Sequence, residues 1–205
     1  ILAVQLQNEG LLSLDEPIIK YLPEFARSDF DKNKITLRHL ITHTSGLVEI
    51  PKRDYPKILI KLIFRTGKGK LFPPRYSLKT SDFLKEVYQL KLQNNPGTKF
   101  RYSNTGVGLV GKILERVTGL SYEELLKSRI LTPLNMNDTT ITLSGDHKEK
   151  LSTGYLYTGK ESDPIHIPAI ASAGNMYSTV NDLIKFLKRS EEHTSELQSL
   201  RHLVC

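Results

Sequence analysis

The sequence predicts a mixed α/β (α+β) domain that is mainly helical. Apolar residues recur at helical spacing in several segments, whereas strand-like patterns are limited to short stretches at residues 139–143 and 154–157. Of the 205 residues, 39% are hydrophobic and 25% are charged, which is typical of globular domains. The chain is therefore long enough and apolar enough to form one domain with a hydrophobic core.

The first 46 residues contain two predicted helical segments and a connector. Residues 1–9 carry apolar side chains in a pattern typical of a buried helix, and Gly10 is suited to end that helix as a C-cap. A proline-punctuated connector follows, with a brief helix at residues 18–22. Thr36 is a favourable N-cap for a short helix that ends near residues 44–46.

The middle of the chain is predicted to be a helical insert. It extends over residues 51–95 and is broken by a Gly/Pro-rich stretch at residues 67–74. A turn at Pro96 and Gly97 then leads into a short extended stretch that ends at Ser103. A helix is expected to begin directly after this stretch.

That helix has three glycines in its early turns, Gly106, Gly108 and Gly111. Because glycine has no side chain, we expect another element to pack closely against this surface. A capping box at Ser121 and Glu124 predicts the start of the next helix, which ends before Pro133. A further helix is expected after Ser178 and Thr179.

Charge and cysteine content narrow the classes of partner. The formal net charge is +7, but the basic residues are spread along the chain, so we predict no nucleic-acid partner. No apolar run reaches the length of about 18 residues that a membrane-spanning helix needs, so no transmembrane segment is expected. The single cysteine, Cys205, excludes a disulfide framework and a thiolate metal cluster.

The two ends of the chain suggest an internal fragment. The chain starts at Ile1 without a methionine or a signal peptide, so we expect the true N-terminus to be missing, and localisation stays open. The segment before residue 189 is rich in lysine and aliphatic residues, and this composition changes abruptly at residues 189–205 (RSEEHTSELQSLRHLVC). These residues resemble a translated sequencing adapter. The alternative is a natural charged helix. We expect residues 1–188 to be the partial domain and residues 189–205 to be a non-native tail.

The stretch PGTKFRYSN at residues 96–104 is the most informative for chemistry. Tyr102 and Asn104 are two residues apart in an extended segment, so their side chains are expected to project to the same side. A phenol can transfer a proton, and a carboxamide offers both a donor and an acceptor. Together these two groups could move a proton and orient a carbonyl.

Four segments resemble the serine β-lactamase-related family and occur in that family's order. They are NEGLLSLDEPIIKYL at residues 8–22, ITLRHLITHTSGL at 35–47, PGTKFRYSN at 96–104 and GVGLVGKILERVTGLSYEELLKSRILTPLNMNDT at 106–139. The family includes class C β-lactamases, penicillin-binding-like proteins, D-alanyl-D-alanine carboxypeptidases and esterases. The resemblance implies a β-lactamase/transpeptidase-like fold, here mainly its helical part, with most of the antiparallel sheet missing.

The resemblance also implies roles for residues of this chain. Tyr102 corresponds to the tyrosine that acts with a lysine as the acid/base pair, and Asn104 to the asparagine that holds substrate and lysine. Ser103 and Gly174 are predicted substrate contacts. Gly174 belongs to a segment of small residues, 172–175, that is expected to form the floor of the cleft. A phenol with an ordinary pKa of about 10 is a weak base at neutral pH, so it needs a neighbouring ammonium group.

The chain departs from the family pattern at the nucleophile. No serine is followed three residues later by lysine, so the Ser-x-x-Lys motif is absent. The family places this motif at the start of the helix whose end we assign to residues 1–9. We therefore expect the nucleophile to precede Ile1 and the fragment to be inactive. The family's last motif, Lys/His-x-Gly, is expected beyond residue 188.

Three other patterns favour structural interpretations. Lys79–Ser81 resembles the last motif but precedes Tyr102, so we interpret it as a helix cap. His39 and His43 lie four residues apart, but without a third ligand we interpret the second as a turn-capping residue and expect no metal. The GxGxxG pattern formed by the three glycines lacks the strand–helix–strand context of a phosphate loop.

The sequence thus predicts a parent serine hydrolase that cleaves an amide or ester through an acyl-serine intermediate, without a metal or organic cofactor. Backbone N–H groups would hold the oxyanion. The substrate is expected to be a small molecule or peptide, such as a β-lactam, a D-amino-acid peptide or an ester, and oligomeric state stays open. Two alternatives remain: a non-catalytic recognition domain and a non-functional gene-prediction fragment.

Overall fold

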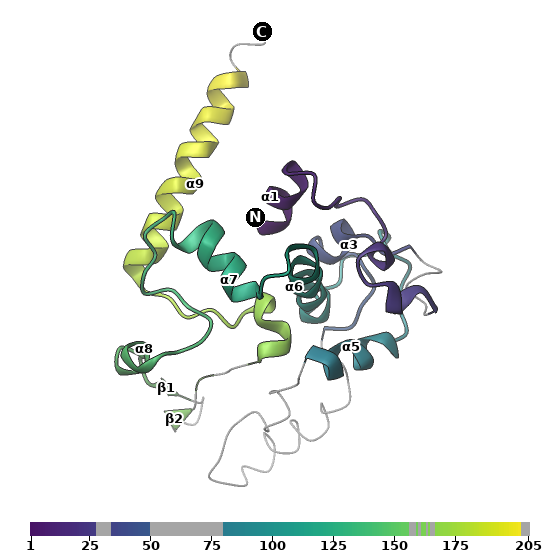
Figure 1. The fold of residues 1–205 in the computed structure, drawn as a ribbon, viewed down its shortest axis with the longest axis horizontal. Coiled ribbons are helices and arrows are strands. Elements are labelled where there is room, and N and C mark those ends of the chain that lie inside the picture. The colour runs from purple at the N-terminus through teal and green to yellow at the C-terminus, as the bar shows by residue number, and fades with distance from the viewer. Residues whose placement is uncertain are drawn as a thin grey trace. The chain divides into compact units, whose positions relative to one another are not determined.

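A computed structural model describes residues 1–27, 34–49, 80–155, 159, 161–162, 164 and 167–201 (Figure 1). The chain divides into two compact units. The first unit comprises residues 1–122 and 152–175, and the second comprises residues 123–151 and 176–205. The predicted insert up to residue 79, and with it Lys79, lies outside the described residues.

The elements of the first unit are mainly helical. They are α1 (Leu2–Asn8), η1 (Ile18–Lys20), η2 (Pro23–Arg27), α3 (Leu37–Ile41), α5 (Thr80–Tyr88), α6 (Asn104–Thr118), β1 (Gly154–Tyr155), β2 (Glu161–Ser162) and η6 (Pro168–Ala173). Helix α7 (Tyr122–Leu126) spans the boundary between the two units. The second unit continues with the π-helical η5 (Lys127–Leu131), α8 (Gly145–Glu149) and α9 (Val180–Arg201).

Helix α1 ends as the sequence predicts. Gly10 has a φ of +73°, the left-handed conformation that glycine adopts without strain. Its N–H donates to the carbonyl of Gln7, and the Leu11 N–H donates to that of Leu6, both at 2.9 Å. These two bonds form a Schellman motif, which satisfies carbonyls that the helix end leaves free.

Helix α3 begins with the predicted threonine cap. The Thr36 hydroxyl accepts from the His39 N–H at 3.3 Å, and the Thr36 N–H donates to His39 Nδ1 at 3.2 Å. Burial, the largest influence, lowers the pKa of His39, which helps to keep its Nδ1 unprotonated as an acceptor. His39 is therefore committed to the helix cap.

The core of the first unit is built around α6. Helices α1 and α3 and the turn η6 all contact α6. Side chains that are almost completely shielded from solvent come from the connector, α3, α5 and α6: Ile18, Leu22, Phe25, Leu37, Leu40, Phe83, Leu109 and Ile113. Since α6 carries Asn104 in its first turn, this core also fixes the position of the predicted site.

Gly108 and Gly111 of α6 allow η6 to approach closely, as predicted, whereas an added Cβ on Gly106 would not meet η6. A Cβ on Gly108 would lie 2.6 Å from Ile170 Cγ2, and a Cβ on Gly111 would lie 2.8 Å from Ser172 Cβ. The Ser172 hydroxyl donates to the Val107 carbonyl at 2.7 Å. Close packing therefore explains Gly108 and Gly111, and η6 is held to α6 by both shape and a hydrogen bond.

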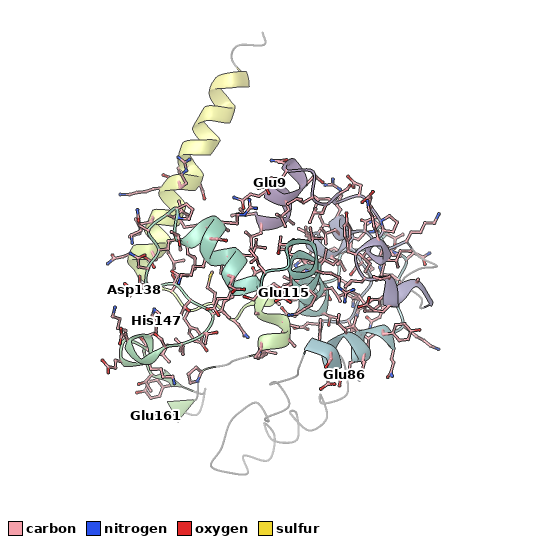
Figure 2. All side chains as sticks on the ribbon, viewed as in Figure 1. Glu9, Glu86, Glu115, Asp138, His147 and Glu161 are labelled. Carbon is pink, nitrogen blue, oxygen red and sulfur yellow. The ribbon has the colours of Figure 1, made fainter. Side chains whose placement is uncertain are left out.

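The far end of α6 carries an ion pair that also caps α7. Glu115, which Figure 2 labels on α6, accepts from Lys112 Nζ at 2.8 Å, and the Lys112 side chain is 7% exposed. The other Glu115 oxygen accepts from the Tyr122 N–H at 3.1 Å. Helix α7 thus begins directly after Ser121, as predicted, and Glu115 satisfies one of its free N–H groups.

Two local predictions differ from the structure. In the predicted strand at residues 139–143, only Thr140 forms a β-bridge, with Tyr177. The N–H groups of Ile141 and Thr142 instead donate to the Glu123 carboxylate at 2.9 and 2.8 Å, so they are not available to a strand partner. In addition, α5 already includes Thr80, so the predicted cap at 79–81 is partly the first helical turn.

Apart from isolated β-bridges between Pro17 and Thr36 and between Thr140 and Tyr177, the described residues form one short pair of strands. Strands β1 and β2 pair antiparallel, with Gly154 opposite Ser162 and Tyr155 opposite Glu161. The prediction of β-structure from residue 154 is thus confirmed for its first two residues, while residues 156–157 lie outside the described part. A mainly helical structure with few strands confirms the predicted fold class.

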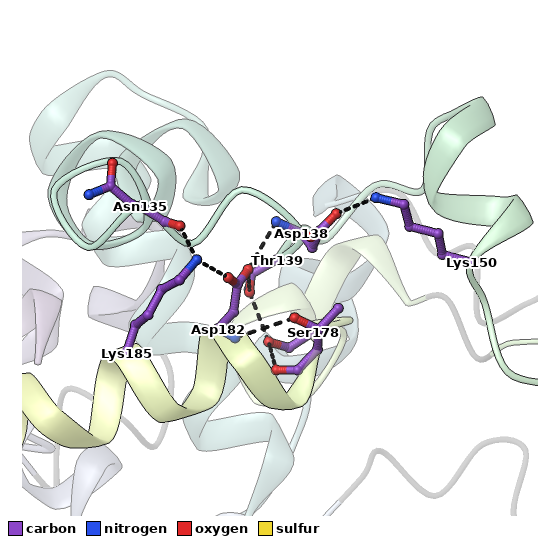
Figure 3. Close-up of polar contacts among 8 residues, drawn as sticks. Asn135, Asp138, Thr139, Lys150, Ser178, Asp182 and Lys185 are labelled. Atoms are coloured by element: carbon purple, nitrogen blue, oxygen red, sulfur yellow. Dashed lines mark hydrogen bonds and ion pairs between the residues drawn. The ribbon is translucent and has the colours of Figure 1, made fainter.

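A buried carboxylate organises the second unit (Figure 3). Asp182, whose side chain is 2% exposed, accepts from the Asp138 N–H and the Thr139 hydroxyl at 2.9 Å and from Lys185 Nζ at 2.8 Å. Lys185 also donates to the Asn135 carbonyl. These bonds fasten the loop at residues 135–139 to the first turn of α9.

We expect Asp182→Asn to lower the free energy of unfolding by about 1.5 kcal/mol at pH 7, because a charge-assisted bond to Lys185 is lost. Burial raises the pKa of Asp182, but the bonds from Lys185, Thr139 and the Asp138 N–H outweigh it and lower the pKa below its usual value. A lowered folded-state pKa gives stability above the unfolded value of about 3.9 that is lost at lower pH. Urea unfolding should therefore show the two proteins converging below about pH 4. The exposed Asp146→Asn serves as the control, and an equal loss in both variants would contradict the role of Asp182.

Helix α9 runs without interruption from Val180 to Arg201. The backbone therefore does not mark a boundary at residue 188, and the adapter origin of residues 189–205 stays a prediction. Within the described residues, no helix combines the length and apolar character needed to cross a bilayer.

Candidate active site

Two chain segments lie side by side where α6 begins. The Arg101 N–H donates to the His43 carbonyl at 2.7 Å, and the Thr105 N–H donates to the Glu49 carbonyl at 3.0 Å. The Gly97 N–H donates to the Thr44 carbonyl at 2.8 Å, with Gly97 at a φ of +79°. Backbone hydrogen bonds to the loop after α3 therefore fix the position of the stretch that carries Tyr102.

Ser103 is the N-cap of α6. Its hydroxyl accepts from the Gly106 N–H at 2.9 Å and donates to the Val48 carbonyl at 2.8 Å. The residue is 0% exposed. The hydroxyl is thus committed to the cap, and the expected substrate contact of Ser103 stays a prediction.

Tyr102 and Asn104 lie together, as their spacing predicts. The Tyr102 hydroxyl donates to Asn104 Oδ1 at 3.1 Å. Tyr102 is 51% exposed, so its phenol is open to a ligand. The Asn104 Nδ2 group retains two donors, which can bind a carbonyl oxygen. The pair can therefore combine proton transfer with substrate orientation.

His43 was interpreted from the sequence as a turn residue, and it contacts the predicted catalytic residue directly. Its ring centroid lies 4.7 Å from that of Tyr102 and 5.8 Å from that of Phe100. Its Nδ1 accepts from the Ser103 N–H at 3.2 Å. Sequence spacing could not reveal these contacts, because His43 and Ser103 are separated by 60 positions.

The same geometry separates the two histidines. Helix α3 ends at Ile41, and His43 lies beyond it with a φ of +57°. His39 caps the start of α3 and His43 contacts residues 100–103, so they do not form a pair on one helix face. In the part of the chain that the structure describes, no cluster of three histidine, cysteine or acidic residues suits a metal.

Gly174 belongs to a different segment. It follows η6 with a φ of +141°, a conformation that side chains rarely permit, and no atom would lie within 4 Å of an added Cβ. Its neighbour Asn175 is 5% exposed. Among the described contacts, no hydrogen bond joins Gly174 to Tyr102 or Asn104, so its predicted substrate contact stays a prediction.

Comparison with known sequences identifies relatives that are more than twice as long. The chain matches the Beta-lactamase family over residues 1–204. It is 30% identical to the D-alanyl-D-alanine-carboxypeptidase/endopeptidase AmpH of Escherichia coli K12, over 91% of this chain and 44% of that protein. It is 26% identical to the teichoic acid D-alanine hydrolase of Staphylococcus aureus, over 94% of this chain and 43% of that protein. The chain thus spans less than half the length of these relatives.

Solved structures agree with the sequence relatives. A class C beta-lactamase superposes with a TM-score of 0.71 at 27% identity, covering 91% of this chain and 46% of that one. A beta-lactamase/D-alanine carboxypeptidase from Pseudomonas syringae gives a TM-score of 0.70 at 25% identity, with the same two coverages. Family match, relatives and fold agree, and the chain therefore belongs to the beta-lactamase family.

Proposed function

We propose that this chain is part of a serine hydrolase that transfers an acyl group from an amide or ester to water through an acyl-serine intermediate. The observation that carries the proposal is the half-exposed phenol of Tyr102, hydrogen-bonded to Asn104 at the start of α6. A proton-transfer group must be accessible to substrate and held in place, and Tyr102 meets both conditions.

In this proposal the phenol of Tyr102 moves the proton and Asn104 orients the reacting carbonyl. A serine alcohol becomes a nucleophile when a neighbouring base takes its proton as it attacks. Tyr102 acts as that base together with a lysine ammonium group, which favours the phenolate. The same phenol returns the proton to the leaving group when the acyl bond breaks.

The serine and the lysine are assigned to a part of the protein that precedes residue 1. No Ser-x-x-Lys occurs in the 205 residues, and the hydroxyl of Ser103, the serine next to Tyr102, is committed to the helix cap. Helix α1 contacts α6. A nucleophile on an extension of α1 would therefore belong to an element already packed against the helix that carries Asn104.

The substrate class is a small molecule or peptide with a cleavable acyl bond. The relatives are named for β-lactams, for D-alanyl-D-alanine peptides and for D-alanine on teichoic acid. These three substrate classes share an acyl carbonyl that a nucleophile can attack. No cofactor is required by the roles assigned to Tyr102 and Asn104.

Mass spectrometry after incubation with benzylpenicillin tests the proposal. The full-length protein, with a Ser-x-x-Lys before residue 1, should gain one penicilloyl group or release penicilloic acid, while the 205-residue chain should do neither. A penicilloyl group on a serine of the 205-residue chain would overturn the placement of the nucleophile. A full-length protein that binds penicillin but neither forms a covalent adduct nor releases penicilloic acid would instead be a recognition domain.

A further inference from the structure

His43 makes contacts with three consecutive parts of the stretch that carries Tyr102. Its carbonyl accepts from the Arg101 N–H at 2.7 Å, its Nδ1 accepts from the Ser103 N–H at 3.2 Å, and its ring packs against the Tyr102 ring. We propose that His43 is a positioning residue that fixes the Tyr102 phenol for proton transfer, an inference that rests on the proposed hydrolase function.

The imidazole is the acceptor for a backbone donor that the helix cannot satisfy. Ser103 is the N-cap of α6, so its own N–H lies outside the helical hydrogen-bond ladder. Because Nδ1 accepts this N–H, the ring carries its proton on Nε2. The bond fixes the peptide unit between Tyr102 and Ser103, and so fixes the direction in which the Tyr102 side chain leaves the backbone.

The imidazole also supplies a packing surface for the phenol. Tyr102 is 51% exposed, and few contacts therefore hold its ring. One is the hydroxyl bond to Asn104, and another is the His43 ring at a centroid distance of 4.7 Å with an angle of 38° between the planes. Ring pairs at this separation attract each other beyond simple burial. Removing the imidazole would leave the phenol held mainly at its tip.

The backbone conformation at His43 brings its carbonyl and its ring to the same stretch of chain. Its φ of +57° lies in the left-handed region, which is uncommon for a residue with a side chain. A residue keeps such a conformation where several surrounding contacts hold it in place. Here the strained turn aligns the carbonyl with Arg101 and the ring with Tyr102 and Ser103.

Two substitutions separate the contacts of His43. His43→Asn keeps a side-chain acceptor for the Ser103 N–H and tolerates the positive φ, but it loses the ring. His43→Phe keeps a ring against Tyr102 but removes the acceptor. His147→Asn, in the second unit, provides a control for the loss of a histidine.

The first readout uses the 205-residue chain and requires no activity. Nitrogen-15 NMR should show His43 with an unprotonated Nδ1 at pH 7.5. Hydrogen exchange of the Ser103 amide should become at least tenfold faster in His43→Phe. In His43→Asn it should become less than threefold faster, because the asparagine side chain still accepts the Ser103 N–H. A His43 ring protonated at Nδ1, or equal exchange in all variants, would overturn the inference.

The second readout uses the full-length protein and an ester substrate. His43→Phe should lower kcat about tenfold or more with KM changed less than threefold, because misplacing a proton-transfer group affects the transition state more than binding. His43→Asn should recover only part of this loss, because it restores the acceptor for the Ser103 N–H but not the ring against Tyr102. If kcat falls equally in the two variants and in proportion to the drop in melting temperature, His43 has only a structural role and the inference is overturned. A wild-type protein without acyl transfer would reject the proposed function, while the NMR result would stand separately.

Discussion

Replacing Tyr102 with phenylalanine should slow acylation by about 10²- to 10⁴-fold in the full-length protein, the usual contribution of one general acid/base group. The substitution removes only the hydroxyl, so it deletes the proton-transfer group and the bond to Asn104. The ring and its contact with His43 remain, and the half-exposed site needs no repacking. Stopped-flow measurement of acyl-enzyme formation checks the rate, and thermal unfolding checks the fold.

A second tyrosine offers a matched control for Tyr102→Phe. Tyr155 lies in β1, is 65% exposed and belongs to the same unit. Tyr155→Phe should leave acylation unchanged within about twofold, as is usual for surface substitutions away from a site. If Tyr102→Phe also acylates at the wild-type rate, the phenol carries no proton in the reaction and its assigned role is wrong.

The features that the sequence predicted well depend on neighbours in the chain. Tyr102 and Asn104 are two positions apart, so an extended backbone is enough to bring their side chains together. The cap at Thr36 and the glycine end of α1 at Gly10 also follow from local preferences. Close packing at Gly108 and Gly111 was predicted, but the sequence did not predict that η6 is the element that packs there.

The features that the sequence missed depend on distant pairs. His43 acts on Ser103 across 60 positions, and no pattern of spacing identifies which loop meets the start of α6. Glu123 is a similar case, since its carboxylate accepts from the N–H groups of residues 141 and 142, in a stretch whose strand-like pattern predicted β-structure. The Glu123 carboxylate accepts these backbone hydrogen bonds in place of a strand partner. Local β-propensity contains no information about such a distant side chain.

The packing of η6 on α6 gives the largest expected effect on stability. Replacing Gly111 with alanine should lower the free energy of unfolding by about 2 kcal/mol, because overpacking costs up to about 3 kcal/mol and the better helix propensity of alanine returns about 1 kcal/mol. The added Cβ would clash with the Ser172 hydroxyl and lie 2.8 Å from Ser172 Cβ. The Cβ cannot move away without its backbone, so η6 must shift and the Ser172 bond to Val107 must lengthen.

Gly106 provides a control in the same helix. A Cβ at Gly106 would meet its nearest neighbour, Ser103 Oγ, at 3.4 Å, an ordinary contact. Gly106→Ala should therefore keep or raise stability by up to about 1 kcal/mol, through helix propensity alone. Chemical unfolding of both variants measures the difference in the free energy of unfolding, which we expect to be about 2 to 3 kcal/mol. If Gly111→Ala is as stable as Gly106→Ala, η6 does not rest on α6 as described, and the segment that ends at Gly174 would lose its link to the helix that carries Asn104.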